Sequence, residues 1–486
     1  MMRNHLGEVK EGKRMRVLCM AVAGLSLVAL AAGASEGDVR AITTEEWKEL
    51  AAYWTAEGAG EADADETDAL TLDVRQCVEM ALAQNAQVFV SQDDVDAARA
   101  KVGQARSGLL PQVKAQVAFA HVDGLEASIG GIVGDLFASG LLPDKDTRTD
   151  KFSVSQMLYA GGQIRAAIEA ADYLATSQQW QRQAILNELE FQTKQSYYAC
   201  LLTRAIVRVA DGSVKTFQRH LDDAKQMLEV GLISNFEVLR AKTEVGARQS
   251  DLVAAKNAQR LALVNLHRIL ALPQDQPFRL VGTPGMAPVE TGLDALLEQA
   301  YQNRPELLAL DKAILAAERN VRRVKGQFLP RAAATADWTN TDGGGQSMPD
   351  GWTVALGVEW DLYTGGRRKH EMAEAKALQK KLEHQRDDVK RLIELDVRRS
   401  YILMEDALAK IREEKGTVEL GREGCRLAQL RFQEGVGTQT ETLDAELALT
   451  AAETALVRAL HEYAVALASI EKATAQSWVG PESAAE

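Results

Sequence analysis

The chain has 486 residues, a formal net charge of −13, 26 % charged residues and only 5 % aromatic ones. This length suits two or three ordinary domains, or one architecture built from repeated units. The acidic balance excludes a nucleic acid as partner, because binding to phosphates needs a basic patch and no folded segment carries one. Its cysteines are widely separated and show no spacing typical of a disulfide framework or a zinc site; they are Cys19, Cys77, Cys200 and Cys425.

Residues 1–34 have the pattern of a secretory signal peptide. Basic residues precede an apolar run from Val17 to Ala32, and the small residues up to Ala34 suit a cleavage site. Starts at Met1 and at Met15 both fit this pattern, and an uncleaved membrane anchor is the alternative. Residues 35–69 then form an acidic extension, with a short helix near 44–55 and no function that the sequence indicates.

A large unit occurs twice in the chain. The segment Leu109-Leu110-Pro111 resembles Phe328-Leu329-Pro330, and Tyr159-Ala160-Gly161-Gly162 resembles Tyr363-Thr364-Gly365-Gly366, in the same order. The unit is too long for a solenoid repeat, so the pattern indicates duplication of a whole fold unit. We expect a first repeat at 70–272, a connecting segment at 273–291, a second repeat at 292–475 and a tail at 476–486.

Each repeat contains a long tract without proline, bounded by Pro143 and Pro273 in the first repeat and by Pro349 and Pro481 in the second. Proline costs about 3 kcal/mol inside a helix, so such tracts favour long helices. Apolar residues there alternate steps of three and four, as between positions 214 and 228, which is typical of a coiled-coil seam.

Each tract is expected to form a helical hairpin. Gly231 and Gly435 interrupt the helical pattern, and Ser234 and Thr438 are candidate N-caps in capping boxes completed by glutamates three residues later. A helix over 163–230 would extend for about 100 Å. We expect it to lie beside two shorter helices stacked end to end, over 234–271 and 304–327.

Four segments have the period-two alternation of β-strands. The clearer two are 112–121 and 352–361, and the weaker two are 151–159 and 331–339. Strands of about ten residues with one apolar face fit a transmembrane β-barrel, while a soluble sheet with one buried face is the alternative. The segments 122–150 and 340–351 would be extracellular loops, and the candidates for interfacial aromatic girdles are Tyr159, Trp338, Trp352 and Trp360.

Four strands cannot close a barrel, and an open sheet edge is not tolerated in lipid. If these strands lie in a membrane, several chains must therefore assemble. The long helices indicate the same, because their apolar seams need neighbouring helices to cover them.

The repeat order, the Leu-Pro entries, the Tyr-x-Gly-Gly junctions and the turn around Gly231 together resemble the TolC-like outer-membrane efflux family, over roughly residues 70–475. The resemblance implies a mainly α fold with a small β part. It also implies a homotrimer with a twelve-stranded barrel in the outer-membrane lipid and a long α-helical tunnel in the periplasm. Such a protein passively exports solutes in a tripartite efflux or type I secretion system, with a periplasmic adaptor protein and an inner-membrane pump as partners.

The resemblance also suggests a site at the periplasmic entrance. Glu441 and Asp444 match two acidic family positions; they are three residues apart, so they share a helix face, and Glu237 matches an acidic position after the first turn. Rings of such carboxylates attract cations, although helix capping and a solvated helix face are the alternatives. Gly437 stands where family members carry an arginine that helps to hold the entrance closed, and Arg240 is a candidate substitute.

The two turns are the candidate docking sites for the adaptor, with simple helix reversal as the alternative. Their residues are Val230, Gly231 and Leu232 in the first turn and Gly435, Val436 and Gly437 in the second.

Catalytic motifs are missing from the sequence. His370-Glu371 begins like a zinc-protease motif, but Glu374 stands where the second histidine is needed. We therefore predict no enzyme, no metal site and no cofactor. The rival interpretation is a periplasmic coiled-coil adaptor or scaffold without a membrane barrel, which explains the helices and the signal peptide but not the duplicated strands.

Overall fold

The computed structural model describes residues 46, 47, 49, 50, 70–121, 146–281, 291–342 and 348–475. The predicted signal peptide, most of the acidic extension, the tail at 476–486 and the central parts of both predicted loops lie outside the described residues. The chain divides into the units Met1–Ile42 and Thr43–Glu486, and all described residues belong to the second unit.

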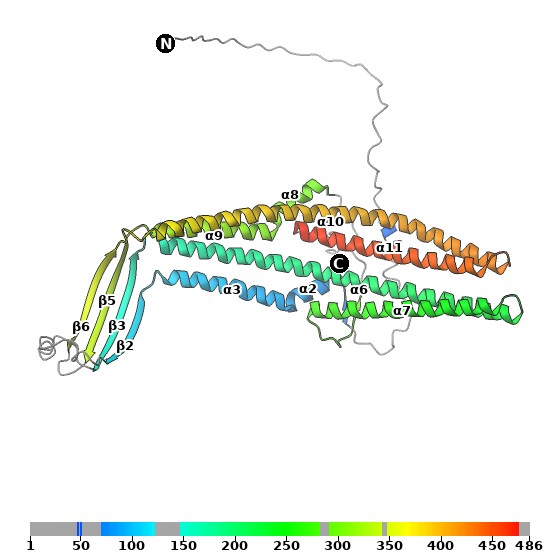
Figure 1. Cartoon of the computed structure of the whole chain (residues 1–486), viewed down its shortest axis with the longest axis horizontal. Coiled ribbons are helices and arrows are strands. Elements are labelled where there is room, and N and C mark those ends of the chain that lie inside the picture. Colours follow the sequence, from blue (N-terminus) through cyan, green and yellow to red (C-terminus); the bar gives the residue numbers. More distant parts are fainter. Residues whose placement is uncertain are drawn as a thin grey trace, which may run out of the picture. The chain divides into compact units, whose positions relative to one another are not determined.

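The helices of the two halves correspond in order and in length (Figure 1). The pairs are α2 (Val74–Gln84) with α8 (Leu293–Asn303), 11 residues each; α3 (Ala86–Ser107) with α9 (Pro305–Gly326), 22 each; α6 (Gln163–Glu229) with α10 (Arg367–Gln433), 67 each; and α7 (Asn235–Leu270) with α11 (Gln439–Thr474), 36 each. Two helical hairpins, α6–α7 and α10–α11, are therefore present at the predicted places.

The strands form a small two-stranded sheet and one four-stranded sheet. In the first, β1 (Leu70–Leu72) pairs in parallel with β4 (Phe278–Leu280). The second has the antiparallel order β2-β3-β5-β6, with β2 at Gln112–His121, β3 at Asp146–Tyr159, β5 at Arg331–Asp342 and β6 at Met348–Glu359. The pairing of β3 with β5 joins the two halves, and β2 and β6 are the edges of this sheet in the described part of the chain.

The four-stranded sheet has one apolar and one polar face, because residues directly opposite each other in an antiparallel ladder share a face. One apolar row contains Ala115, Phe152, Trp338 and Trp352, and the adjacent polar row contains Lys114, Ser153, Asp337 and Thr353. Trp352 is 68 % exposed and Val354 is 80 % exposed. The apolar face is thus left open by the described chain, which argues against a soluble sheet with a buried face.

Two strands begin earlier than predicted. β3 already begins at Asp146 and β6 at Met348, so part of each predicted loop belongs to a strand, and β6 ends at Glu359. The side chains of Arg148 and Asp150 are polar, but ladder hydrogen bonds join backbone groups, so pairing continues past the apolar segment.

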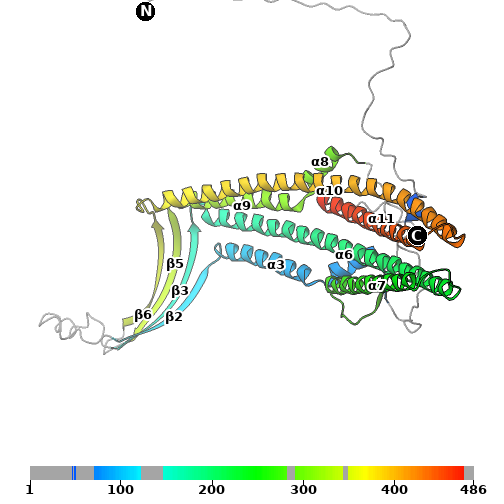
Figure 2. The same cartoon turned by 45° about the vertical axis from the view of Figure 1, so that its right-hand side comes forward.

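The long helices lie in a layer beside the shorter ones (Figures 1 and 2). Near the sheet the order across the layer is α3-α6-α9-α10, and toward the hairpin turns it is α7-α6-α11-α10. Both long helices therefore lie against helices of the second half, while α3 and α7 form one edge of the layer and α10 forms the other.

The shorter helices meet end to end within their own half. Asn85 Nδ2, before α3, donates to the carbonyl of Ile269 in α7 at 2.8 Å, and Arg304 Nε, before α9, donates to the carbonyl of Ala473 in α11 at 2.8 Å. Each bond satisfies a carbonyl of the last helical turn, which has no partner in its own helix. The predicted stacking of 234–271 on 304–327 was therefore wrong.

A buried ion pair links α6 to α11. Lys194 Nζ lies 2.6 Å from Glu190 and 2.5 Å from Glu471, and the Lys194 side chain is only 8 % exposed. Burial disfavours the charged lysine, but the attraction of Glu471 and Glu190 outweighs it, so the pKa of Lys194 lies above its usual value.

Part of the acidic extension packs on the second hairpin. The described residues 46, 47, 49 and 50 are helical, as the sequence indicated. Trp47 stacks on Tyr463 with ring centroids 5.0 Å apart, and Lys415 lies within 4 Å of both Glu46 and Glu49. This contact fastens the extension to α10 and α11.

We predict that Lys194→Ala lowers the free energy of unfolding by about 3 kcal/mol, because Glu471 loses its partner in a buried place. Circular dichroism during denaturation in detergent measures this change. Arg75→Ala, which removes an exposed pair with Glu79, is the control and should cost at most about 1 kcal/mol. Equal effects of the two substitutions would show that the buried link does not stabilise the fold.

Candidate functional site at the hairpin turns

The first turn ends α6 with a glycine in the left-handed conformation. Gly231 has a φ of +77° and donates to the carbonyl of Leu228 at 3.0 Å, while Leu232 donates to that of Met227 at 2.9 Å. These two bonds form a Schellman motif, in which glycine avoids the steric cost of a positive φ.

The second turn repeats this geometry. Gly435 has a φ of +73° and donates to Phe432 at 3.0 Å, and Val436 donates to the carbonyl of Arg431 at 3.0 Å. Gly437 adds a further bond to the same Arg431 carbonyl at 2.9 Å, so the second turn is wound more tightly against its helix.

Close packing explains the glycine at position 437. A Cβ atom on Gly437 would lie 2.9 Å from Arg431 Cβ and 3.1 Å from the backbone nitrogen of Phe432. The first distance is shorter than real Cβ contacts, so an arginine cannot occupy this position without movement of the turn. The packing of the turn thus disfavours any side chain at position 437.

Both predicted N-cap residues precede their helices, but only one of them makes a side-chain capping bond. Thr438 precedes α11, and its hydroxyl accepts from the Glu441 amide at 3.2 Å. Ser234 precedes α7, but its hydroxyl makes no capping bond, so the predicted capping box there was wrong. The Glu237 amide instead donates to the Ser234 carbonyl at 3.1 Å.

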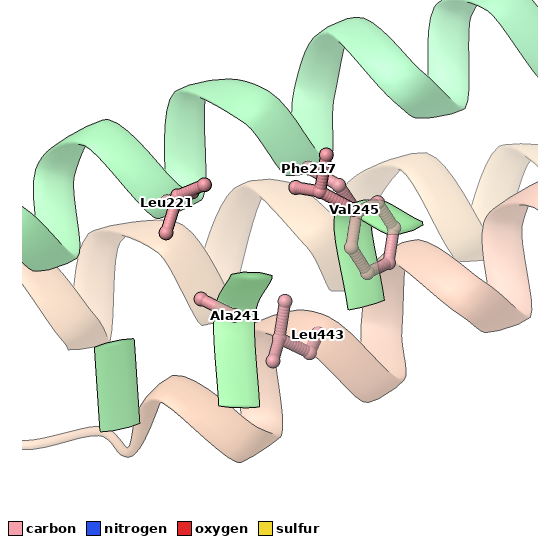
Figure 3. Close-up of a cluster of buried hydrophobic side chains, with 5 residues drawn as sticks. All are labelled: Phe217, Leu221, Ala241, Val245 and Leu443. Atoms are coloured by element: carbon pink, nitrogen blue, oxygen red, sulfur yellow. The ribbon is translucent and has the colours of Figure 1, made fainter. Parts of the chain in front are cut away.

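The two hairpins are joined near their turns by an apolar cluster. Leu443 of α11 packs among side chains of the first hairpin, as Figure 3 shows; they are Phe217, Leu221, Ala241 and Val245. All five are nearly inaccessible to solvent. The start of α11 is therefore anchored between α6 and α7.

Two polar contacts accompany this cluster. Arg240 Nη1 donates to Thr440 Oγ1 at 2.8 Å, so the residue proposed as a substitute for the missing arginine does reach the second hairpin. Farther from the first turn, His220 Nε2 of α6 lies 3.9 Å from Glu446 Oε1, and both side chains are largely buried.

The predicted carboxylates lie close to these contacts. Glu441 and Asp444 are both exposed on α11, on either side of the buried Leu443, and Glu237 is half-buried at the start of α7. Glu441 Oε2 lies 3.6 Å from Arg431 Nε in a solvent-exposed pair, which contributes little to stability. Within the described residues, Asp444 has no ion-pair partner.

Apolar side chains gather at the first turn. Val230 and Leu232 are exposed there, and so are Phe236 and Leu239 in the first two turns of α7; at the second turn Val436 is exposed. The sequence interpretation named the turns but missed Phe236 and Leu239. Their spacing of three, which places them on one face of the start of α7, was a signal that could have identified them.

Neither metal clusters nor spanning helices occur in the described ranges. No group of three or more histidine, cysteine, aspartate or glutamate side chains is arranged there to hold a metal ion. None of the helices described combines the length and the apolar character needed to cross a lipid bilayer.

A family model described as outer membrane efflux protein matches residues 77–272 and 296–476. The chain belongs to this family. The match covers both halves and both turns, and it places the protein among channels of the outer membrane. The rival interpretation as a periplasmic scaffold without a membrane part is therefore wrong.

Curated relatives agree with the family. The outer membrane efflux protein BepC of Brucella suis is 26 % identical over 354 residues, which cover 69 % of this chain and 74 % of the relative. The probable efflux pump outer membrane protein TtgC of Pseudomonas putida is 22 % identical over 406 residues, 79 % of each chain. The alkaline protease secretion protein AprF of Pseudomonas aeruginosa is 22 % identical over 344 residues, 67 % of this chain and 69 % of the relative.

Solved structures share the fold at low sequence identity. The outer-membrane channel OprN matches with a TM-score of 0.71 at 17 % identity and covers 84 % of this chain and 91 % of its own. The Campylobacter jejuni outer membrane channel CmeC matches with a TM-score of 0.71 at 14 % identity, over 92 % and 93 % of the two chains. The mainly α fold with a small β part, predicted from the sequence, is thus confirmed.

We predict that Gly437→Arg loosens the second turn, because the new side chain collides with the end of α10. Limited proteolysis should cut this variant between α10 and α11 several times faster than the unchanged protein. Val436→Arg is the matched control, since Val436 is exposed and an arginine there needs no rearrangement. Equal cutting rates in both variants would contradict the packing explanation.

Proposed function

We propose that the protein is the outer-membrane channel component of a tripartite efflux or type I secretion system. Three copies form a closed barrel in the outer-membrane lipid and a helical tunnel in the periplasm, through which solutes leave passively and without catalysis. The observation that carries this proposal is that the sheet and the helical layer both end in edges that no other described part of the chain covers.

The sheet edges support assembly most directly. β2 and β6 each have one side without a pairing strand among the described residues, and their apolar side chains are exposed. Unpaired backbone groups are not tolerated in lipid, so the sheet has to close on itself or on other copies. Four strands per chain give twelve strands for three copies, which is within the range of outer-membrane barrels.

The helical layer has matching edges. On the side of α10 that faces away from the other helices, exposed apolar residues are separated by three or four residues, or by sums of such steps. A second set of exposed apolar residues lies on the corresponding side of α7. Those of α10 are Leu392, Leu395, Ile402, Leu420, Leu427 and Leu430, and those of α7 are Phe236, Leu239, Val253, Leu261 and Val264. Such stripes are typical of coiled-coil seams, so α10 of one copy would pack against α7 of the next.

The entrance of this tunnel would lie at the hairpin turns. In a trimer Glu441 and Asp444 form rings of carboxylates, helped by Glu237, which favour cations over anions. Arg240 holds the start of α11 through Thr440 and takes part in keeping the entrance closed.

The partners we propose are a periplasmic adaptor protein and an inner-membrane pump. The adaptor would dock on the exposed turn residues, with Val230 and Leu232 at the first turn and Val436 at the second. The relative TtgC is named for an efflux pump and AprF for protease secretion, so the relatives include both kinds of system.

Purified protein in planar lipid bilayers tests the channel. We expect detergent-extracted trimers that produce stepwise conductance, with cations carrying more current than anions. A monomer that never makes bilayers conduct would overturn the proposed function.

The double substitution Glu441→Ala with Asp444→Ala tests the entrance. We expect the reversal potential in a salt gradient to move toward the value for equal cation and anion permeability, because the carboxylate rings are lost. Glu423→Ala with Glu419→Ala, on exposed positions farther from the turn, is the control. An unchanged reversal potential in the double variant would show that these residues are not the filter.

A further inference from the structure

We propose that the polar face of the four-stranded sheet carries a binding zone for multivalent anions, centred on Lys114 and present in each copy of the trimer. The zone would lie inside the barrel, far from the carboxylates of the periplasmic entrance, and would oppose their preference for cations. The inference rests on the proposed trimeric channel and adds a second selectivity element to it.

Three charged side chains lie in two adjacent rows of the polar face. In one row Lys114 of β2 lies opposite Ser153 of β3, which lies opposite Asp337 of β5. In the next row Gln116 of β2 lies opposite Lys151 of β3. Alternate residues of a strand share a face, so the two rows lie about 7 Å apart on the same side of the sheet. Two ammonium groups and one carboxylate are therefore gathered there.

The charges in these two rows do not balance. Lys151 Nζ lies 3.4 Å from Asp337 Oδ1, so these two side chains largely neutralise each other. Lys114 is exposed, and it has no ion-pair partner within the described residues. Each chain therefore contributes one uncompensated positive charge at this level of the sheet.

The surroundings of Lys114 suit an anion with several oxygen atoms. In a barrel whose apolar face contacts lipid, the polar face lines the aqueous interior, so Lys114 of all three copies would point into one lumen. Ser153 and Gln116 place a hydroxyl group and an amide group in the same two rows. Ammonium, hydroxyl and amide groups all donate hydrogen bonds to carboxylate and phosphate oxygens.

Other charges on the polar face lie too far away to cancel that of Lys114. Among the paired residues of the ladders they are Arg331 and Glu359, which lie 3.3 Å from each other. Arg331 precedes Asp337 by six residues on β5, a separation of about 20 Å. Physiological salt screens charges over about 8 Å, so this pair acts separately from Lys114.

The entrance carboxylates are farther away still. The sheet and the second hairpin turn lie at opposite ends of α10, which has 67 residues and is therefore about 100 Å long. The proposed channel would then have two separate electrostatic zones of opposite sign, with negative charge at the hairpin turns and positive charge in the barrel.

The valence of an anion decides how strongly the zone attracts it. Three unit charges about 10 Å from the axis of the barrel, screened by physiological salt, raise the local concentration of a monovalent anion about twofold. Because the electrostatic energy is proportional to valence, the same charges raise that of a trivalent anion about sixfold. The favoured ligands are therefore solutes with several carboxylate or phosphate groups.

Reversal potentials in planar bilayers test this attraction, with chloride and citrate as the anions. The full-length protein carries Glu441→Ala and Asp444→Ala in this experiment, so that the entrance carboxylates do not limit the entry of anions. Adding Lys114→Gln should lower the permeability of chloride relative to potassium about twofold and that of citrate about sixfold. Lys114→Arg keeps the charge and should leave both values unchanged.

Arg148→Gln is the matched control in the same sheet. Arg148 is four residues from Phe152 on β3 and therefore lies on the opposite, apolar face. Its substitution should change neither permeability. Unchanged values with Lys114→Gln, equal losses for chloride and citrate, or an equally large effect of Arg148→Gln would overturn the anion zone and leave the channel standing. Protein that conducts with neither anion would overturn the channel proposal itself.

Chemical labelling tests the placement of Lys114 without any measurement of conductance. In protein reconstituted in lipid vesicles, Lys114→Cys should react with a membrane-impermeant maleimide, because it faces water. Val113→Cys, on the apolar face, should be protected by lipid. The natural cysteines of the described chain are buried, so they contribute little background. Labelling of Val113→Cys that is as fast as that of Lys114→Cys, or faster, would overturn the proposal.

Discussion

The backbone hydrogen bonds of one four-stranded sheet are the constraint on which the whole arrangement depends. An antiparallel sheet in lipid must have no open edge, yet β2 and β6 each present one in the described part of the chain. Other copies of the chain provide strands of the right length and pattern, and the helices that continue from those strands then lie side by side as well. Closure of the strands therefore sets the arrangement of the tunnel, and the coiled-coil seams of α7 and α10 follow it.

Much of this fold was predictable because long-range order in the chain arises from local rules. Proline-free tracts with apolar steps of three and four predicted the long helices, and the interruption of this pattern at Gly231 and Gly435 predicted the turns, where both glycines have a positive φ. The stacking of the shorter helices was predicted wrongly. It depends on Asn85 and Arg304 reaching carbonyls far away in sequence, and no local pattern reveals such contacts.

The candidate site shows the same limit. Glu441 and Asp444 could be named as candidates because they match two acidic positions that the family carries after the second turn. The reason for glycine at position 437 could not be predicted, because it depends on how closely the turn brings this residue to Arg431. The burial of Leu443 between the hairpins was equally invisible, since leucines at seam positions look alike in sequence whether their neighbour is in the same chain or in another.

The two turns share their backbone geometry and differ in their side chains. Phe236 of the first hairpin corresponds to Thr440 of the second, and Val230 corresponds to Glu434. In a closed assembly, hairpin turns with these apolar residues and hairpin turns with these polar residues would then alternate around the axis. A partner made of identical subunits, with one subunit bound to each turn, would have to bind two different surfaces with the same residues. The partner could do so most simply in two ways. Its subunits could adopt two alternating conformations, or every second turn could be bound more weakly.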